Sequence, residues 1–169
     1  MNENSLKIRG DVWMKISKDH LTREQVLENP DRQYHNLIVD VCSNLIASWA
    51  YADSSPTVPG ILSLAVGTGD VGWDLQNPPA ETAGLIELYA ELIRKPVVPS
   101  YVSPPPSNVV DFTTTFDYGE ANGALVEMGL FGGVGALGAG GGIRVNAKHF
   151  PVINKRHDST LTILWELTF

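Results

Sequence analysis

The sequence predicts a mainly β protein of the α+β class: an antiparallel β-sandwich, jelly-roll or immunoglobulin-like, with two packed helices. Three observations support this prediction. The chain ends in an alternating apolar and polar run at residues 160–169. Four strand-like segments with short connections fill its last third, which is typical of sandwiches and barrels. Elsewhere, two segments change to the helical period of about 3.6 residues. We expect one domain over residues 1–169.

The terminal run predicts a strand that is central to the core. Its apolar residues recur at every second position: Leu161, Ile163, Trp165, Leu167 and Phe169. A period of two places them on one face of a strand. Leu164 interrupts the opposite, polar face, so we expect both faces to be partly covered. Trp165 and Phe169 are therefore predicted core residues.

Alternation and β-branched content predict six strands bounded by turn residues. They cover residues 6–17, 61–66, 109–118, 124–131, 143–152 and 160–169. Gly10 is a candidate bulge in the first strand. The polar residues 18–32 are expected to form a loop, and the proline-rich residues 97–108 an extended or irregular segment.

Two apolar stripes with helical spacing predict helices near 33–49 and 81–95. The first stripe comprises Leu37, Ile38, Val41, Leu45, Ile46 and Trp49, and the second Leu85, Leu88, Tyr89, Leu92 and Ile93. Trp49 is thereby a third predicted core aromatic. At the end of the second helix, Arg94 and Lys95 suit the helix dipole, and Pro96 would stop the helix.

Composition argues against several classes of function. The formal net charge is −7, and basic residues are scattered, so nothing favours binding to nucleic acid phosphates. The polar N-terminus and the lack of an apolar run of about 18 residues predict neither a signal peptide nor a membrane span. Cys42 is the single cysteine, so no internal disulfide can form, and we expect a buried, inert thiol.

Two glycine patterns match a dinucleotide-binding motif, at residues 67–72 and 133–138. That motif requires a helix to begin within it, so that backbone amides face the pyrophosphate. Pro78 and Pro79 follow the first pattern, and Gly140–Gly142 follow the second, which disfavours such a helix. We therefore expect no cofactor. The simpler interpretation is a tight turn at the first pattern and a glycine-rich loop over residues 132–142.

No group of residues predicts catalysis or metal binding. Glu120 and Glu127, like His149 and Arg156, are seven residues apart, but nothing in the sequence brings them into one pocket. We expect Glu127 to be partly buried against a cation such as Arg144 or Lys148. The four histidines lack metal-ligand spacing and are expected in surface or turn positions.

Loop residues are the candidates for contact with a partner. Trp73 lies among Gly, Asp, Asn and Pro residues and is expected to be exposed. Tyr101 lies in the proline-rich segment. Gly133, Gly135 and Gly138 belong to a tract with seven glycines in residues 132–142. Because ordering glycine costs much backbone entropy, we expect this tract to be mobile or to order against a neighbouring subunit.

Several segments carry a resemblance to a known family: residues 35–39, 64–69, 81–95, 119–131, 150–155 and 160–169. The most distinctive are EANGALVEMGLF at 120–131 and the terminal strand. They resemble small virion proteins of tailed bacteriophages, including tail and fibre proteins. The resemblance implies a structural component without a cofactor. The tract 132–142 and the proline-rich residues 96–106 depart from the family pattern and leave binding specificity open.

The leading hypothesis is therefore a bacteriophage virion structural protein of the tail, neck or fibre, not an enzyme. It would be made in the host cytoplasm and would assemble as a homo-oligomer with other virion proteins. Only 18% of residues are charged, against about 25% in ordinary soluble domains, which favours a chain that buries surface in an assembly. The alternatives are a capsid decoration protein, a module binding host-surface glycans, and an enzyme with a nucleotide or phosphate substrate.

Overall fold

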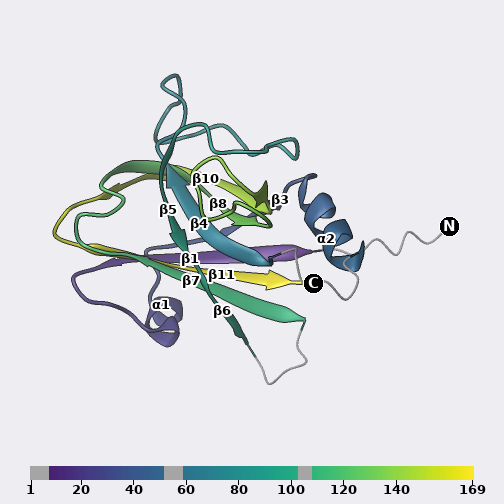
Figure 1. Ribbon diagram of the computed structural model, residues 1–169. Coiled ribbons are helices and arrows are strands. Elements are labelled where there is room, and N and C mark those ends of the chain that lie inside the picture. Colours follow the sequence, from purple (N-terminus) through teal and green to yellow (C-terminus); the bar gives the residue numbers. More distant parts are fainter. Residues whose placement is uncertain (1–7, 52–58, 103–107) are drawn as a thin grey trace.

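The computed structural model describes residues 8–51, 59–102 and 108–169, and it is a mainly β sandwich of two antiparallel sheets (Figure 1). The predicted fold class is confirmed. The five-stranded sheet has the order β2-β1-β11-β7-β6. Its strands are β1 (Arg9–Ser17), β2 (Arg32–His35), β6 (Val98–Tyr101), β7 (Val109–Phe116) and β11 (Thr160–Thr168).

The second sheet has six strands in the order β3-β10-β8-β4-β5, with β9 paired to β8. Its strands are β3 (Leu37–Ile38), β4 (Ile61–Gly67), β5 (Glu91–Pro96), β8 (Gly123–Gly132), β9 (Ile143–Arg144) and β10 (Asn146–Lys155). The six predicted strands thus correspond to β1, β4, β7, β8, β9 with β10, and β11. Gly10 pairs in regular register with Leu167, so it is not a bulge. Its missing side chain instead makes room for Asn36.

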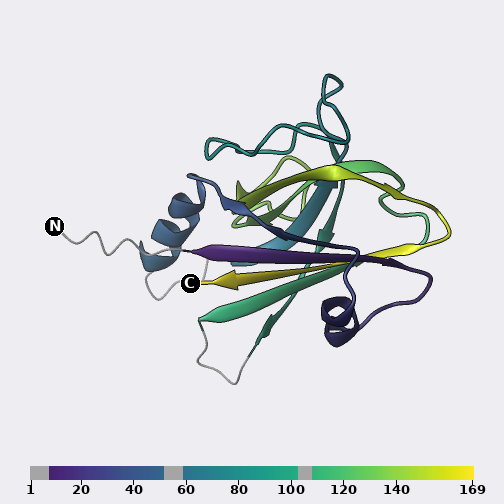
Figure 2. The same ribbon diagram turned by 180° about the vertical axis from the view of Figure 1, so that it is seen from behind.

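The core lies between the two sheets, and β11 runs through the centre of one of them. Trp165 is fully buried, and Trp49 and Phe169 pack at the margin of the same cluster. The prediction of a core position is therefore confirmed for Trp165, whereas Trp49 and Phe169 are only partly buried. Leu164 is also fully buried on the opposite face, where helix α1 (Arg23–Glu28) contacts β1 and β11 (Figure 2). Both faces of the terminal strand are covered, as its sequence predicts.

Two paths of the chain pass from one sheet to the other and close both sides of the sandwich. On one side, β2 ends the five-stranded sheet, and after Asn36 the chain enters β3 at the edge of the six-stranded sheet. On the other side, β5 continues through Val97 into β6 (Figure 1). Strands that change sheets form the corners of a sandwich and tie the two layers together.

The outer edge of the β5–β6 segment is blocked by two prolines. The Val97 N–H donates to Leu62 O at 3.0 Å, and the Val102 N–H donates to Val109 O at 3.4 Å. Because successive N–H groups alternate between the two sides of a strand, the nitrogens of Pro96 and Pro99 face outward. A proline there removes the donor that an added strand would need. This edge is therefore unsuited to pairing with another sheet.

The helices differ most from the predictions. Residues 81–90 form a loop and residues 91–96 form β5, so the predicted helix over 81–95 is wrong. The reason is tertiary: β5 pairs with β4, and Glu127 binds the backbone N–H groups of Tyr89 and Ala90. The predicted helix over 33–49 is reduced to α2 (Cys42–Tyr51), because residues before it pair with β1 and β10.

The polar segment 18–32, expected to be a loop, contains the short helix α1. Its N-terminus carries a capping box, in which Thr22 and Gln25 satisfy each other's backbone N–H groups. The Arg23 guanidinium then pairs with the fully buried Asp111 on β7. A sequence signal for this helix was thus present in Thr22 and Gln25, and the ion pair fixes the helix on the outer face of the five-stranded sheet.

Candidate interaction surfaces

A long loop, residues 68–90, connects β4 to β5. It crosses the outer face of the six-stranded sheet. Structureless loops of this length are uncommon in compact domains and are often functional. Leu88 is its buried apolar anchor and packs in a small cluster with Ala65, Phe131 and Ala136. Ala136 belongs to the glycine-rich tract 132–142, so the two segments cover the same face. We call residues 68–90 and 132–142 together the loop platform.

The Glu127 carboxylate fastens both ends of loop 68–90 to the sheet. Glu127 is fully buried. Its Oε1 accepts the N–H groups of Gly69 at 3.1 Å and Ala90 at 2.8 Å, and its Oε2 accepts that of Tyr89 at 2.9 Å. A Cβ on Gly67 would lie 2.6 Å from Oε1, so glycine is required for this close approach. The expected structural role of Glu127 holds, but backbone amides rather than a cation are its direct partners.

The Arg144 guanidinium is a second buried anchor. It is fully buried and donates to the carbonyl oxygens of Glu87 on the loop and of Asn146, the latter at 3.0 Å. Burial lowers the pKa of Arg144 to about 10, and the negative charge of Glu127 opposes this shift. The group therefore remains a cation at neutral pH and compensates the nearby Glu127 charge.

Trp73, Tyr89 and His149 form an aromatic cluster where loop 68–90 meets β10. The ring centroids lie 4.8 Å apart for Trp73 and Tyr89 and 4.5 Å apart for Trp73 and His149. Trp73 is half-buried rather than exposed, whereas Tyr89 is 53% exposed. Of the two rings, Tyr89 is the one that faces solvent more.

His149 departs from the expectation that each histidine occupies a surface or turn position. It is buried on β10, and its Nδ1 lies 2.8 Å from the Pro79 carbonyl oxygen. Its backbone N–H donates to Glu81 at 2.6 Å, and Glu81 also pairs with Lys148 at 2.8 Å. Burial lowers the pKa of His149, which favours the neutral ring. His20, His35 and His157 are exposed, as predicted.

The glycine-rich tract is hydrogen-bonded to its own sheet. The Arg94 guanidinium donates to Ala136 O at 3.1 Å and to Gly141 O at 2.6 Å, and the Ser63 hydroxyl also donates to Ala136 O. The expectation that a neighbouring subunit is needed to order the tract is therefore wrong. Of its predicted interface glycines, Gly133 is buried, whereas Gly135 and Gly138 are exposed.

The surface of the loop platform is apolar and acidic. Large apolar side chains protrude from it: Val71, Leu75, Ile86, Tyr89, Val134 and Leu137. Val71 is the extreme case and is fully exposed. Asp70, Asp74 and Glu87 are exposed on the same loop, and neither segment contains a lysine or arginine. Clustered exposed apolar side chains mark contact surfaces.

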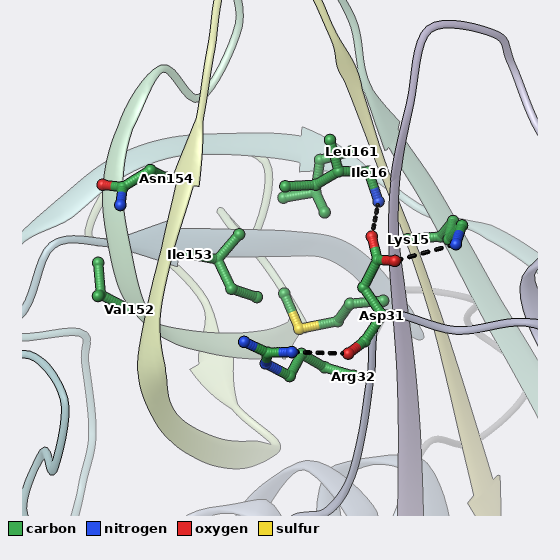
Figure 3. A pocket seen from close by; sticks show the side chains of 9 residues that line it. Lys15, Ile16, Asp31, Arg32, Val152, Ile153, Asn154 and Leu161 are labelled. Carbon is green, nitrogen blue, oxygen red and sulfur yellow. Dashed lines mark hydrogen bonds and ion pairs between the residues drawn. The ribbon is translucent and has the colours of Figure 1, made fainter.

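A pocket opens on the side of the sandwich where β2 begins. It has a volume of about 340 Å³ and lies between β1 with Asp31 and Arg32 on one side and β10 on the other (Figure 3). Its floor is made of the core residues Met14, Ile153 and Leu161. A register shift in β10 between His149 and Ile153 accompanies this opening, which is a usual effect of a bulge.

Asp31 takes the place of a strand partner at the rim of this pocket. Its carboxylate accepts the Ile16 N–H at 2.8 Å and pairs with Lys15 Nζ at 2.9 Å. Arg32 Nη1 donates to the Asp31 carbonyl oxygen at 2.9 Å, and Figure 3 shows the Arg32 side chain reaching toward Ile153. The rim therefore combines two cations with one carboxylate. None of these rim residues was a candidate from the sequence, since isolated charges in a predicted strand or loop do not indicate a site.

Glu120, the other carboxylate considered from the sequence, lies in a network of ion pairs and hydrogen bonds that joins neighbouring turns. Lys95 Nζ pairs with Glu120 at 2.6 Å and with Asp117 at 3.0 Å. The buried Lys155 ammonium donates to the carbonyl oxygens of Asp117 at 2.9 Å and Ser159 at 2.8 Å, which joins two turns. Glu120 and Glu127 thus have separate partners.

Three further predictions concern single residues. Arg156 is exposed, whereas His149 is buried, so the two do not form a site. Cys42 is buried and unpaired, and burial raises the pKa of its thiol, which confirms a buried thiol. The side chain of Tyr101 lies outside the described part of the chain.

Known proteins provide no identification. No protein-family model, curated protein or solved structure matches this chain.

Within residues 8–51, 59–102 and 108–169, no three or more His, Cys, Asp and Glu side chains are grouped so as to hold a metal ion. No helix in those same ranges has both the length and the apolar character to cross a membrane.

Proposed function

We propose that this chain is a structural protein of a bacteriophage virion, a component of the tail, neck or fibre that assembles as a homo-oligomer. The observation that carries the proposal is the loop platform. It presents apolar side chains outward while buried anchors, Glu127 and Arg144, hold it to the sheet. A surface held rigidly before contact loses little conformational freedom when a partner binds.

The closed sides of the sandwich are consistent with this role. The outward-facing prolines Pro96 and Pro99 disfavour open-ended pairing of sheets, so contacts between copies would be made by loops. Structural oligomers usually have closed symmetry. A capsid decoration protein would satisfy the same description and differs only in its place in the particle.

The test is to raise antibodies against the purified chain and to examine phage particles from a host that carries its gene. Labelling of intact particles at the tail, neck or fibre in electron micrographs is the expected result, together with an oligomer in analytical ultracentrifugation. Labelling of the head alone would favour decoration. A strictly monomeric chain that is absent from all particles would refute the proposal.

A second candidate, a module binding host-surface glycans, is favoured by one observation. The half-exposed Tyr89 ring is supported from behind by Trp73 and His149, and rigid aromatic rings are suitable platforms for sugar rings. Binding on a glycan array that is lost in Tyr89→Ala but kept in Tyr118→Ala, another exposed tyrosine, would support this alternative.

A further inference from the structure

We infer that the tip of loop 68–90, Asp70 and Val71, of one copy docks into the pocket between β1 and β10 of the next copy. This inference rests on the proposed assembly and specifies its contact. It joins two surfaces that lie on different parts of the same chain, so the contact is heterologous. Each copy would give its loop tip to one neighbour and receive a loop tip from another.

The loop tip protrudes into solvent, and its backbone is held in one conformation by hydrogen bonds. Val71 is fully exposed and Asp70 beside it is exposed. The backbone below them is held by Gly69, whose N–H binds Glu127 and whose φ of 69° favours glycine, and by the Trp73 N–H, which donates to Asp70 O at 3.0 Å. Little freedom remains to be lost on docking.

The pocket has the complementary form and chemistry. Its floor of Met14, Ile153 and Leu161 is apolar, and its volume of about 340 Å³ is ample for a valine side chain. Arg32 is exposed at the rim and has N–H donors beyond the one given to Asp31. A guanidinium binds carboxylates in two-pronged geometry, so Arg32 is the expected partner of Asp70 when Val71 enters the pocket.

The distribution of charge favours docking of the loop tip into the pocket over contact between two loop platforms. The platform segments carry four carboxylates, from Asp70, Asp74, Glu81 and Glu87, and no cations. Glu81 is paired with Lys148, but two platforms face to face would still bring like charges together, which is unfavourable. The pocket rim, with Lys15, Arg32 and Asp31, has an excess of positive charge. The acidic tip of one copy therefore matches the pocket of another.

A charge-exchange experiment tests the contact. The full-length chain, Arg32→Glu, Asp70→Lys and the double variant are compared by sedimentation over a range of concentrations. We expect each single variant to weaken association at least tenfold and the double variant to restore it to within about threefold, since opposite charges again meet. Arg9→Glu and Glu24→Lys, exposed charges that belong to neither surface, serve as matched controls and should associate like the wild type. Thermal unfolding of every variant confirms that each remains folded.

The outcomes separate this inference from the proposed function. If the wild type associates and the single variants associate equally well, or the double variant is no better than the single ones, the docking contact is refuted while assembly stands. If the isolated chain is monomeric at every concentration tested but present in particles, self-docking is refuted while the place in the virion stands. If it is monomeric and absent from particles, the proposed function itself fails.

Discussion

Replacing Glu127 with glutamine is the sharpest test of how the loop platform is held. The substitution keeps the shape of the side chain but turns one carboxylate oxygen into an NH2 group. If the amide oxygen keeps the N–H groups of Gly69 and Ala90, the new NH2 faces the N–H of Tyr89, which had donated to Oε2 at 2.9 Å. Two donors then oppose each other in a buried site.

The expected cost follows from these contacts. A hydrogen bond to a charged group contributes about 1.5–3 kcal/mol, and a buried donor left without an acceptor costs about 1–3 kcal/mol. Arg144 also loses the nearby negative charge that favours its cationic form. Because these effects overlap, we expect a total loss of about 3–5 kcal/mol in the free energy of unfolding.

Urea denaturation of the full-length chain measures this loss, and Glu28→Gln, an exposed carboxylate on α1, is the matched control, expected to change stability by less than about 0.5 kcal/mol. Hydrogen exchange adds a local readout, since the amides of Gly69, Tyr89 and Ala90 should lose protection. A loss below about 1 kcal/mol, with those three amides still protected, would refute the reasoning.

Four further predictions concern single residues. Trp165→Ala should lower the free energy of unfolding by about 3–5 kcal/mol, measured by denaturation, because the ring is fully buried. Lys155→Met should cost about 2–4 kcal/mol by leaving carbonyl oxygens of two turns without their donor, seen as a lower melting temperature. Burial lowers the pKa of His149 from its ordinary value of 6.5, so as the pH falls the unfolded chain binds a proton at this residue before the folded chain does. The free energy of unfolding should therefore decrease as the pH drops below about 6.5. In His149→Phe the melting temperature should decline less steeply over the same pH range. Gly142→Ala should cost about 1–3 kcal/mol, because φ is 76° and the new Cβ would lie 2.6 Å from Ala136, whereas Gly138→Ala, without such a φ, is the control.

The strands could be predicted because their signal is local. In residues 109–169 apolar residues alternate and turn residues separate the segments, and β7, β8, β10 and β11 lie close to their predicted bounds. Their partners are less local, since β11 pairs with β1 and β7. The burial of both faces of β11 was also foreseen, from Leu164. What its sequence could not indicate is that α1 supplies the cover.

The second predicted helix failed because distant residues decide its conformation. The spacing of Leu85, Leu88 and Leu92 suits a helix, yet Glu127 binds the amides of Tyr89 and Ala90, and β4 pairs with the residues that follow. Intrinsic helix preference amounts to less than about 1 kcal/mol per residue, so a buried carboxylate and a strand ladder override it. The sequence contains a pattern that predicts the helix. It contains none that predicts the contact with Glu127 or the pairing of β5 with β4.

The loop platform and the pocket could hardly be predicted, because they too depend on contacts between residues that are far apart in the sequence. Trp73 and the glycines of residues 132–142 were singled out, but the exposed neighbours, Val71 and Tyr89, were not. An isolated valine between Asp70 and Gly72 has no distinguishing pattern. The pocket depends on where β2 begins and where β10 shifts register, and both features arise only after the two sheets have packed together.

The corner segments β2–β3 and β5–β6 have a mechanical consequence. Because each is a continuous piece of chain shared by both sheets, the layers cannot slide or swing apart without tearing backbone hydrogen bonds on one side of the molecule. A load applied to the loop platform on the outer face of one sheet is therefore transmitted through the corners to the other sheet. The domain would therefore respond to force as a stiff block.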